Sequence, residues 1–296
     1  MLDNLVTTVQ ALAAGRWQPT PPVCFGVSRP KAREIHAPAY ADRVVHHWLV
    51  PRLEAVYEPV FIHDVYSNRR GKGIHAAVDR LQGFMRALHT GQQASGFYLQ
   101  LDIANFFNSI DRPLLFALLQ GRLRKGVRAG RVEAEAACLL RDVSHRILRQ
   151  DVGRVARPIG DRRLLARIPA HKRLLHAGAD KGLPIGNLTS QFFANVYLNE
   201  LDQFIKHTLK CRYYLRYVDD FLLLHASEAQ LRQWEGQISD FLAERLHLRL
   251  RTSSVLRPCA DGADFLGYIV RPWYRLVRRR VVGNCRERLD GFAREL

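Results

Sequence analysis

The chain has 296 residues, a mass of 33.9 kDa and a net charge of +17 at pH 7, from 45 Lys and Arg against 28 Asp and Glu. A basic surplus of this size favours a nucleic-acid partner, because Lys and Arg displace the counterions condensed on phosphates, and an anionic membrane surface is the weaker alternative. The five cysteines include no CxxC pair, which argues against a zinc ribbon and a disulfide framework, and no signal-like or membrane-length apolar run is present, so we expect a cytoplasmic protein with no membrane partner.

The first half of the chain is predicted to be mixed in structure. Residues 1–14 have the pattern of a short helix, and apolar residues at helical spacing predict a second helix over 42–57. Residues 97–103 alternate as a strand, with Asp102 on the face opposite the apolar residues. Asp111, followed by Pro113, predicts the start of a further helix.

The second half begins with a basic connector over 121–180. A long helix is predicted from Leu188 to about Leu209, and 213–224 has the pattern of a hydrophobic hairpin interrupted by two acids. Ser227 and Gln230 form a capping-box pattern that predicts another helix.

Two short strands are predicted at the end of the chain, around Phe265–Val270 and Tyr274–Val282. Strands and helices therefore alternate along the chain without a regular βαβ repeat. This order predicts an α+β fold, with helices packed on an antiparallel sheet.

Three carboxylates have no evident structural role: Asp102 on the predicted strand, and Asp219 with Asp220 between two apolar strands. Neighbouring acids inside a hydrophobic hairpin are costly, because each loses water close to a like charge. A divalent cation removes this cost, and Mg²⁺ prefers carboxylate and phosphate oxygens. Two such ions would activate a 3′-hydroxyl and stabilise a leaving pyrophosphate. Taken alone, the Asp-Asp pair is more typical of an exposed hairpin turn than of a metal site.

Six motifs, in this order, resemble those of reverse transcriptases over nearly the whole chain. They are Pro30–Ile35 and Tyr66–Gly73 for the fingers, Leu101–Asp111 for the first catalytic strand, Gly182–Gln191 for the template and nucleotide loop, Tyr217–Asp220 for the catalytic hairpin, and Asp264–Tyr268 for the turn that grips the primer. The resemblance implies an RNA-directed DNA polymerase that uses an RNA template, a DNA or RNA primer and dNTPs, with two Mg²⁺ ions or, alternatively, Mn²⁺.

The resemblance also implies roles for individual residues. Asp102, Asp219 and Asp220 would be catalytic, and the same three with Ile103 would lie at the metal ions. The incoming nucleotide would be contacted by Lys31, Arg33, Arg70, Phe107 (a steric gate against ribose), Ile185 and Gly186. The template or primer would be contacted by Ser190, Gln191 and Gly267. The lysine usual after the last palm helix is missing, and Arg249 or Arg251 is its candidate replacement.

The implied architecture is a right-hand polymerase. We expect fingers over 15–96, a palm over 97–275 that includes the basic connector, and only the start of a thumb over 276–296. The thumb of such enzymes is a longer helical domain, so this one is short or missing.

The template loop departs from the common pattern, with Ile185 in place of Gln and Gln191 in place of Pro. This variant resembles enzymes of diversity-generating retroelements, which implies error-prone copying at template adenines and a basic accessory protein as a partner. A free-standing reverse transcriptase of a retron, group II intron, CRISPR or antiviral-defence system is an alternative. A non-catalytic nucleic-acid-binding module that retains the palm is an alternative of another class.

Overall fold

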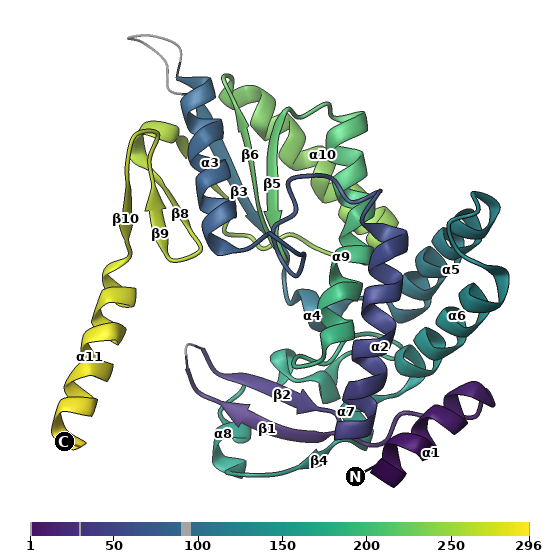
Figure 1. Cartoon of the computed structure of the whole chain (residues 1–296). Helices are drawn as coiled ribbons and strands as arrows, with labels where there is room; N and C mark the ends of the chain where they lie inside the picture. Colours follow the sequence, from purple (N-terminus) through teal and green to yellow (C-terminus); the bar gives the residue numbers. More distant parts are fainter. Residues whose placement is uncertain (1, 30, 90–95, 296) are drawn as a thin grey trace. The chain divides into compact units, whose positions relative to one another are not determined.

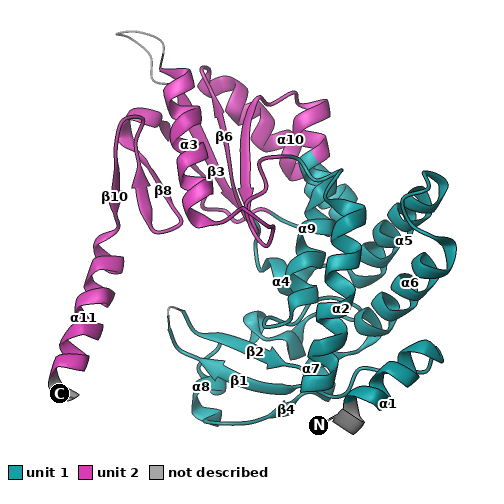
Figure 2. Ribbon diagram, viewed as in Figure 1, with its two compact units in different colours: residues 1–62, 103–202, 241–249 teal, residues 63–102, 203–240, 250–296 magenta. Residues whose placement is uncertain are grey.

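The computed structural model describes residues 2–29, 31–89 and 96–295 (Figure 1). Pro30, the first residue of the predicted Pro30–Ile35 motif, lies outside the described residues. Two compact units are present, each made of three separated stretches of chain (Figure 2). Unit 1 comprises 1–62, 103–202 and 241–249, and unit 2 comprises 63–102, 203–240 and 250–296. Among the described residues, no helix is both long and apolar enough to span a membrane.

Unit 2 is built on a four-stranded antiparallel sheet with the strand order β5-β6-β3-β7. The strands are β3 (Phe97–Asp102), β5 (Tyr213–Tyr217), β6 (Asp220–His225) and β7 (Val255–Pro258). The predicted strand and the predicted hairpin are therefore confirmed. The two lie next to each other because β3 pairs with β6 along its whole length, from Phe97 opposite His225 to Asp102 opposite Asp220.

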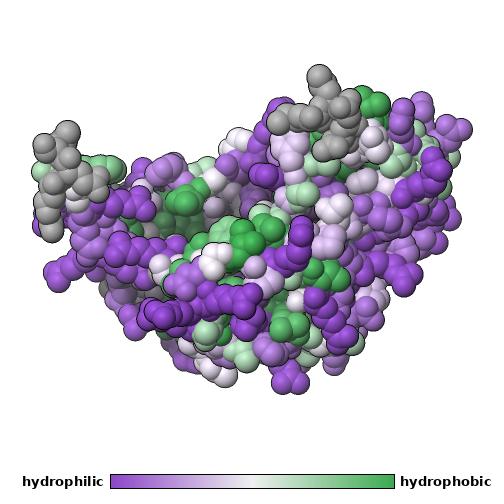
Figure 3. Space-filling view, turned by 90° about the horizontal axis from the view of Figure 1, so that it is seen from below, coloured by the Kyte–Doolittle hydropathy of each residue, from purple (hydrophilic) through white to green (hydrophobic). Residues whose placement is uncertain are grey.

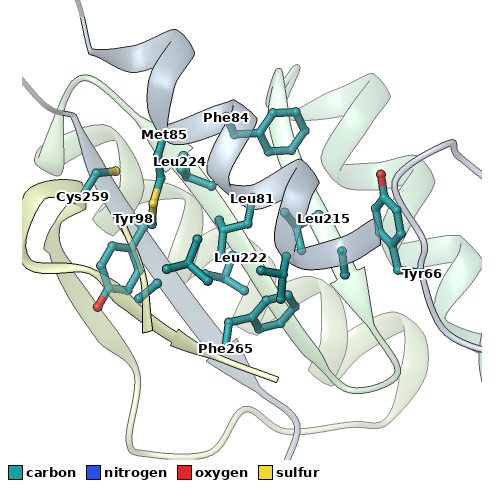
Figure 4. Packing of buried hydrophobic residues seen from close by; sticks show 14 residues of the cluster. Tyr66, Leu81, Phe84, Met85, Tyr98, Leu215, Leu222, Leu224, Cys259 and Phe265 are labelled. Carbon is teal, nitrogen blue, oxygen red and sulfur yellow. The ribbon is translucent and has the colours of Figure 1, made fainter. Parts of the chain in front are cut away.

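The core of unit 2 lies between this sheet and helix α3 (Ile74–Leu88), which crosses one face of it (Figure 1). Figure 4 shows the apolar side chains of α3 pointing at those of the strands; the buried members include Leu81, Met85, Tyr98, Leu222 and Phe265. Tyr98 is 2% exposed. The face predicted to be polar is therefore buried at Tyr98, whereas Gln100 and Asp102 on the same face are half-buried.

The C-terminal part of unit 2 forms a second antiparallel sheet and a helix. Its elements are β8 (Ala263–Phe265), β9 (Tyr268–Val270), β10 (Arg275–Val277) and α11 (Arg279–Glu295). The strand predicted over Tyr274–Val282 is wrong beyond Val277, because the apolar residues from Val281 onward recur at helical spacing (Val281, Cys285, Leu289, Phe292). The strand predicted over Phe265–Val270 is interrupted by a turn at Leu266 and Gly267, both with positive φ.

Helix α10 (Glu228–Leu246) begins in unit 2 and ends in unit 1. Ser227 caps it as predicted, since its hydroxyl accepts the N–H of Gln230 at 3.3 Å. The Gln230 side chain donates to Gln233, three residues on, at 3.2 Å. The hydrogen bond that the serine contributes to a capping box is therefore formed.

Unit 1 contains a small sheet with the order β2-β1-β4. β1 (Val23–Val27) and β2 (Arg33–Ala37) form an antiparallel hairpin, and β4 (Arg157–Pro158) pairs with β1 in parallel. The last strand comes from the predicted basic connector. This stretch is thus a structural part of unit 1, with helices of its own.

The helices of unit 1 are α1 (Leu2–Ala13), α2 (Tyr40–Tyr57), α4 (Phe106–Ser109), α5 (Arg112–Arg128), α6 (Ala134–Arg149), α7 (Val152–Val155), α8 (Arg162–Ala166) and α9 (Leu188–Gln203). Asp111 caps α5 as predicted, accepting the N–H of Leu114 at 2.9 Å. Helix α9 is buried on most sides, and Phe192 packs edge-on against Tyr57 with ring centroids 5.6 Å apart. The predicted long helix is confirmed, with a final π-helical turn at Phe204–Thr208.

The face shown in Figure 3 is mainly hydrophilic, with hydrophobic areas between the polar side chains. The mixed helix and sheet composition, with antiparallel strand pairs in both units, confirms the predicted α+β class.

Candidate active site

The three predicted catalytic carboxylates all lie at one edge of the unit 2 sheet. Asp102 ends β3 directly opposite Asp220, the first residue of β6. Asp219 lies in the tight turn between β5 and β6, next to Asp220 in the chain. Two segments more than a hundred residues apart are thus paired by strand register. Ile103 follows Asp102 directly and is 1% exposed.

The pKa of Asp220 is strongly perturbed. Burial, together with the charges of Asp102, Asp219 and Asp264, raises the pKa of Asp220 from 3.8 to about 7. The amide of Gln100 opposes this shift by donating to both carboxylate oxygens of Asp220, at 3.0 and 3.3 Å. Gln100 lies two residues before Asp102 and therefore shares its face of β3. Its position on the predicted strand indicates this neighbourhood with Asp102, and Gln100 was not among the predicted site residues.

Asp102 forms an ion pair with the side chain of Arg251. The guanidinium of Arg251 lies 2.7 Å from Asp102 Oδ2, and the Arg251 N–H donates to the Asp102 carbonyl at 2.8 Å. Of the two arginines expected to replace the missing lysine, Arg251 is the one in contact with a predicted catalytic carboxylate. Its side chain is 50% exposed.

Val218, between Tyr217 and the two acids, has a φ of +58°. A β-branched residue in the left-handed region is strained, so its surroundings must hold it there. The Ser67 hydroxyl accepts the Val218 N–H at 3.0 Å, and the buried guanidinium of Arg216 donates to the Val218 carbonyl at 2.9 Å. These two side chains fix the turn that carries Asp219.

Ser67 reaches the turn because the segment before it pairs with β5. The Tyr66 N–H donates to the Arg216 carbonyl at 2.9 Å, and the Arg216 N–H donates to the Asp64 carbonyl at 2.9 Å. Asp64 is itself buried, yet its pKa is lowered because hydrogen bonds from Arg80, His63 and Tyr66 outweigh the effect of burial. Arg70, a predicted nucleotide contact, is exposed on the same segment.

Gly267, a predicted primer contact, lies in the turn between β8 and β9 with a φ of +91°. The Arg278 N–H donates to its carbonyl at 2.9 Å, and the Arg278 side chain forms an ion pair with Asp264. The carbonyl of Asp264 accepts from Gln100 at 3.3 Å. The turn is thereby connected, through Gln100, to the Asp220 carboxylate.

The remaining predicted contacts lie in unit 1, around the loop that precedes α9. The Ile185 carbonyl accepts the N–H of His36 on β2 at 2.8 Å, and the Leu183 N–H donates to the Phe107 carbonyl at 2.7 Å. These bonds bring together the loop, β2 and α4. Ile185 and Phe107 are half-buried.

Gly186 is required by packing as well as by conformation. Its φ is +116°, and a Cβ at this position would lie 2.9 Å from the His36 carbonyl oxygen. This glycine lets the loop backbone approach β2 closely. Lys31 and Arg33, predicted nucleotide contacts, are exposed at the turn and start of β2.

The predicted template and primer contacts Ser190 and Gln191 begin α9. Ser190 is 3% exposed, whereas Gln191 is exposed. The preceding residue, Thr189, is hydrogen-bonded to His46 of α2 at 2.9 Å. Burial lowers the pKa of His46 to about 4, so this imidazole is neutral near pH 7, and it links α2 to the start of α9.

The donor set at the carboxylate edge fits hard divalent cations. It consists of oxygen ligands only, and the pKa of Asp220 is raised first by burial and then by the negative charges of Asp102, Asp219 and Asp264. A divalent cation would offset this negative charge. Asp102, Asp219 and Asp220 are the residues that would hold it.

No protein-family model matches the chain. Among curated proteins, it is 23% identical over 331 aligned positions to Protein YkfC of Escherichia coli, covering 96% of this chain and 76% of that protein. It is also 25% identical over 175 positions to an uncharacterized 91 kDa protein in the cob intron of Schizosaccharomyces pombe, covering 56% of this chain and 16% of that protein.

Among solved structures, the chain is similar to telomerase from Candida albicans in complex with the TWJ fragment of telomeric RNA, with a TM-score of 0.60, 13% identity and coverage of 90% of this chain and 48% of that chain. Apo telomerase from Candida tropicalis matches with a TM-score of 0.57, 12% identity and coverage of 88% and 49%. The chain thus spans about half the length of the telomerase chains that share its fold.

Proposed function

We propose that the protein is an RNA-directed DNA polymerase, with fingers, palm and the start of a thumb, that extends a primer by two-metal nucleotidyl transfer. The observation that carries this proposal is the pairing of Asp102 with Asp220 across β3 and β6, beside Asp219 in a strained turn. The fold shared with telomerases and the similarity to a protein in an intron support it. The net charge of +17 supports nucleic-acid partners.

In this proposal Asp102, Asp219 and Asp220 hold two Mg²⁺ ions, which supply charge stabilisation for the attacking and leaving oxygens when bound. Gln100 orients the Asp220 carboxylate through its two hydrogen bonds. Arg251 neutralises Asp102 without metal and becomes available to phosphate oxygens once a cation takes its place. Ser67 and Arg216 keep Asp219 in position through the Val218 backbone.

In unit 1, we propose that Phe107, Ile185 and Gly186 contact the incoming nucleotide, with Lys31 and Arg33 on its phosphates. This proposal is supported by the way the main chain of these residues is held in place. Ile185 and Gly186 contact His36 of β2, and the carbonyl of Phe107 in α4 accepts the N–H of Leu183. Arg70 in unit 2 is a further phosphate contact, and Gln191 and Gly267 contact template or primer.

The test is Mg²⁺-dependent primer extension on an RNA template by Asp219→Asn. We expect a loss of at least about 10³-fold in rate with primer–template binding retained, because the carboxylate is needed for the chemical step. Asp240→Asn, on the exposed face of α10, makes the same charge change as a matched control and should be as active as wild type. Undiminished extension by Asp219→Asn would refute the site.

We propose further that copying is error-prone, as in diversity-generating retroelements. Ile185 can pack against a nucleotide but cannot hydrogen-bond to it, so part of the advantage of the correct base pair is lost. A polar contact of this kind discriminates by about 1–3 kcal/mol, or roughly 10- to 100-fold. Ile185→Gln should therefore lower the error rate, most of all opposite template adenine.

Sequencing of cDNA made on a defined RNA template measures this, with Ile185→Leu as a size-matched apolar control. A low error rate that is equal for all template bases in the wild-type enzyme would instead favour an intron-type reverse transcriptase. The match to the protein in the cob intron supports that second candidate. If the enzyme belongs to a diversity-generating retroelement, its expected partners are a basic accessory protein and a structured template RNA.

A further inference from the structure

The β1–β2 hairpin of unit 1 carries three potential metal ligands on one face. Cys24 and His36 are direct cross-strand partners, and Glu34 lies two residues before His36 on the same side of β2. All three are buried, with 5%, 2% and 6% of Cys24, His36 and Glu34 exposed. The cluster contains different side chains from those of the carboxylate edge in unit 2.

The ligand atoms already have a spacing suited to a small cation. Cys24 Sγ is 3.3 Å from Glu34 Oε1, and His36 Nε2 is 3.8 Å from the same oxygen. One ligand atom of each residue lies within 4.8 Å of the other two. A tetrahedral zinc centre with bonds of about 2.0–2.3 Å has ligand atoms about 3.3–3.8 Å apart.

We propose that Cys24, Glu34 and His36 bind one Zn²⁺ ion. Sulfur, imidazole nitrogen and carboxylate oxygen are the donors that zinc takes in proteins, and three of them leave a fourth position for water. The nitrogen of His36 nearest Glu34 is Nε2, so Nε2 would be the zinc ligand. The other ring nitrogen, Nδ1, is buried and has no hydrogen-bond partner within the described part of the chain.

Without a metal, Arg173 compensates the charge of Glu34. Its Nε lies 3.8 Å from Glu34 Oε1, while the Leu174 N–H donates to Oε2 at 2.8 Å. On metal binding, the Cys24 S–H bond breaks, its proton goes to solvent, and the sulfur–zinc bond forms. The metal then replaces Arg173 at Oε1. Arg173 and zinc therefore compete for the same carboxylate oxygen.

The site bears on the loop before α9, because His36 is also the residue to which the loop is attached. Its N–H donates to the Ile185 carbonyl, and its carbonyl lies where a side chain on Gly186 would clash. A metal bound to the His36 side chain would fix the position of His36 in β2, in addition to the backbone contacts that His36 makes with the loop. Zinc occupancy should consequently stabilise the segment that carries Ile185.

The experiment uses Co²⁺ as a spectroscopic substitute for Zn²⁺ in the full chain stripped of metal. A thiolate–cobalt charge-transfer band that saturates at one equivalent, and that one equivalent of Zn²⁺ abolishes, is expected. The oxygen ligands of unit 2 cannot produce this band, which makes the readout independent of polymerase activity. Cys24→Ser should abolish it, and His36→Gln should weaken Co²⁺ binding by at least about 100-fold.

Cys259→Ser is the matched control, because Cys259 is a buried cysteine of unit 2, and it should retain the band. Arg173→Gln should tighten Co²⁺ binding by about 10-fold, because the guanidinium that competes for Glu34 is removed. If Cys24→Ser does not fold, the Co²⁺ affinity of Arg173→Gln tests the proposed site instead. A band that persists in Cys24→Ser, its absence in wild type, or unchanged affinity in Arg173→Gln would each overturn the proposal.

Discussion

Two regions of the molecule carry most of the proposed chemistry, and they are built differently. The carboxylate edge of unit 2 gathers acids at partly exposed positions, where Gln100 contacts Asp220 and Arg251 contacts Asp102. The loop and hairpin of unit 1 are held by backbone hydrogen bonds and close packing, as at Ile185 and Gly186. Excess charge of one sign suits a region that binds cations, whereas a fixed backbone suits a region that presents a shape to a ligand.

This difference predicts that changes in the first region alter charge, pH dependence and rate. Changes in the second should alter the choice of substrate and leave the chemical step largely intact. The following variants test that distinction.

The largest effect is expected for Asp220→Asn in the absence of divalent metal. Because the pKa of Asp220 is raised from 3.8 to about 7 in the folded protein, the folded state holds this proton more tightly than the unfolded state. The free energy of unfolding should therefore fall as pH rises from about 4 to about 7. Asp220→Asn removes this loss and should be more stable than wild type at pH 8 by about 1–4 kcal/mol.

Urea unfolding in EDTA at pH 5 and pH 8 measures the difference, with Asp240→Asn as the exposed control. Mg²⁺ should restore stability at pH 8 to the wild type and not to Asp220→Asn. Equal stability of wild type and Asp220→Asn at pH 8 would mean that the pKa of Asp220 is not raised in the folded protein.

A smaller effect, on sugar selection, is expected for Phe107→Ala in unit 1. The half-buried ring contacts Phe106 edge-on, with centroids 5.4 Å apart. If it blocks a ribose 2′-hydroxyl, its removal should reduce the preference for dNTPs over rNTPs by about 10- to 100-fold while extension with dNTPs continues. Phe107→Tyr keeps the bulk and should keep the preference.

Single-nucleotide incorporation with matched dNTP and rNTP measures this ratio. If Phe107→Ala melts like wild type and its dNTP/rNTP incorporation ratio is unchanged, the Phe107 ring serves packing and does not select the sugar.

The smallest effect is expected for Ser67→Ala, which removes the hydroxyl that accepts the Val218 N–H. One hydrogen bond contributes about 1 kcal/mol, so the strained turn should be less well held and extension should slow by about 3- to 10-fold. Ser67→Thr restores the hydroxyl and should recover most of the rate. Ser253→Ala, exposed in the same unit, serves as control.

A fall in kcat with an unchanged KM for dNTP is the expected signature, since Ser67 contacts the turn and not the nucleotide. If Ser67→Ala lowers only the melting temperature, the hydroxyl is structural and does not position Asp219.

Local sequence patterns were sufficient to predict several features of unit 2. The apolar run around Asp219 and Asp220, and the alternation that ends at Asp102, predicted a strand and a hairpin bearing acids, because such patterns depend on residues a few positions apart. The same reasoning extended a strand through Val282, where a short β-branched stretch concealed the helical spacing of α11.

What the sequence by itself determined about this protein was therefore local: the α+β composition, the basic charge, and the acids set between apolar strands. The tertiary structure alone decided which distant residues share an environment. The hydrogen bond from Val218 to Ser67 joins residues 151 positions apart, and the cluster of Cys24, Glu34 and His36 depends on the register of one hairpin. A shift of one residue in that register would turn Cys24 and His36 to opposite faces, because side chains alternate along a strand. Register is set by the packing of whole elements, and for that reason no local pattern of residues contained it.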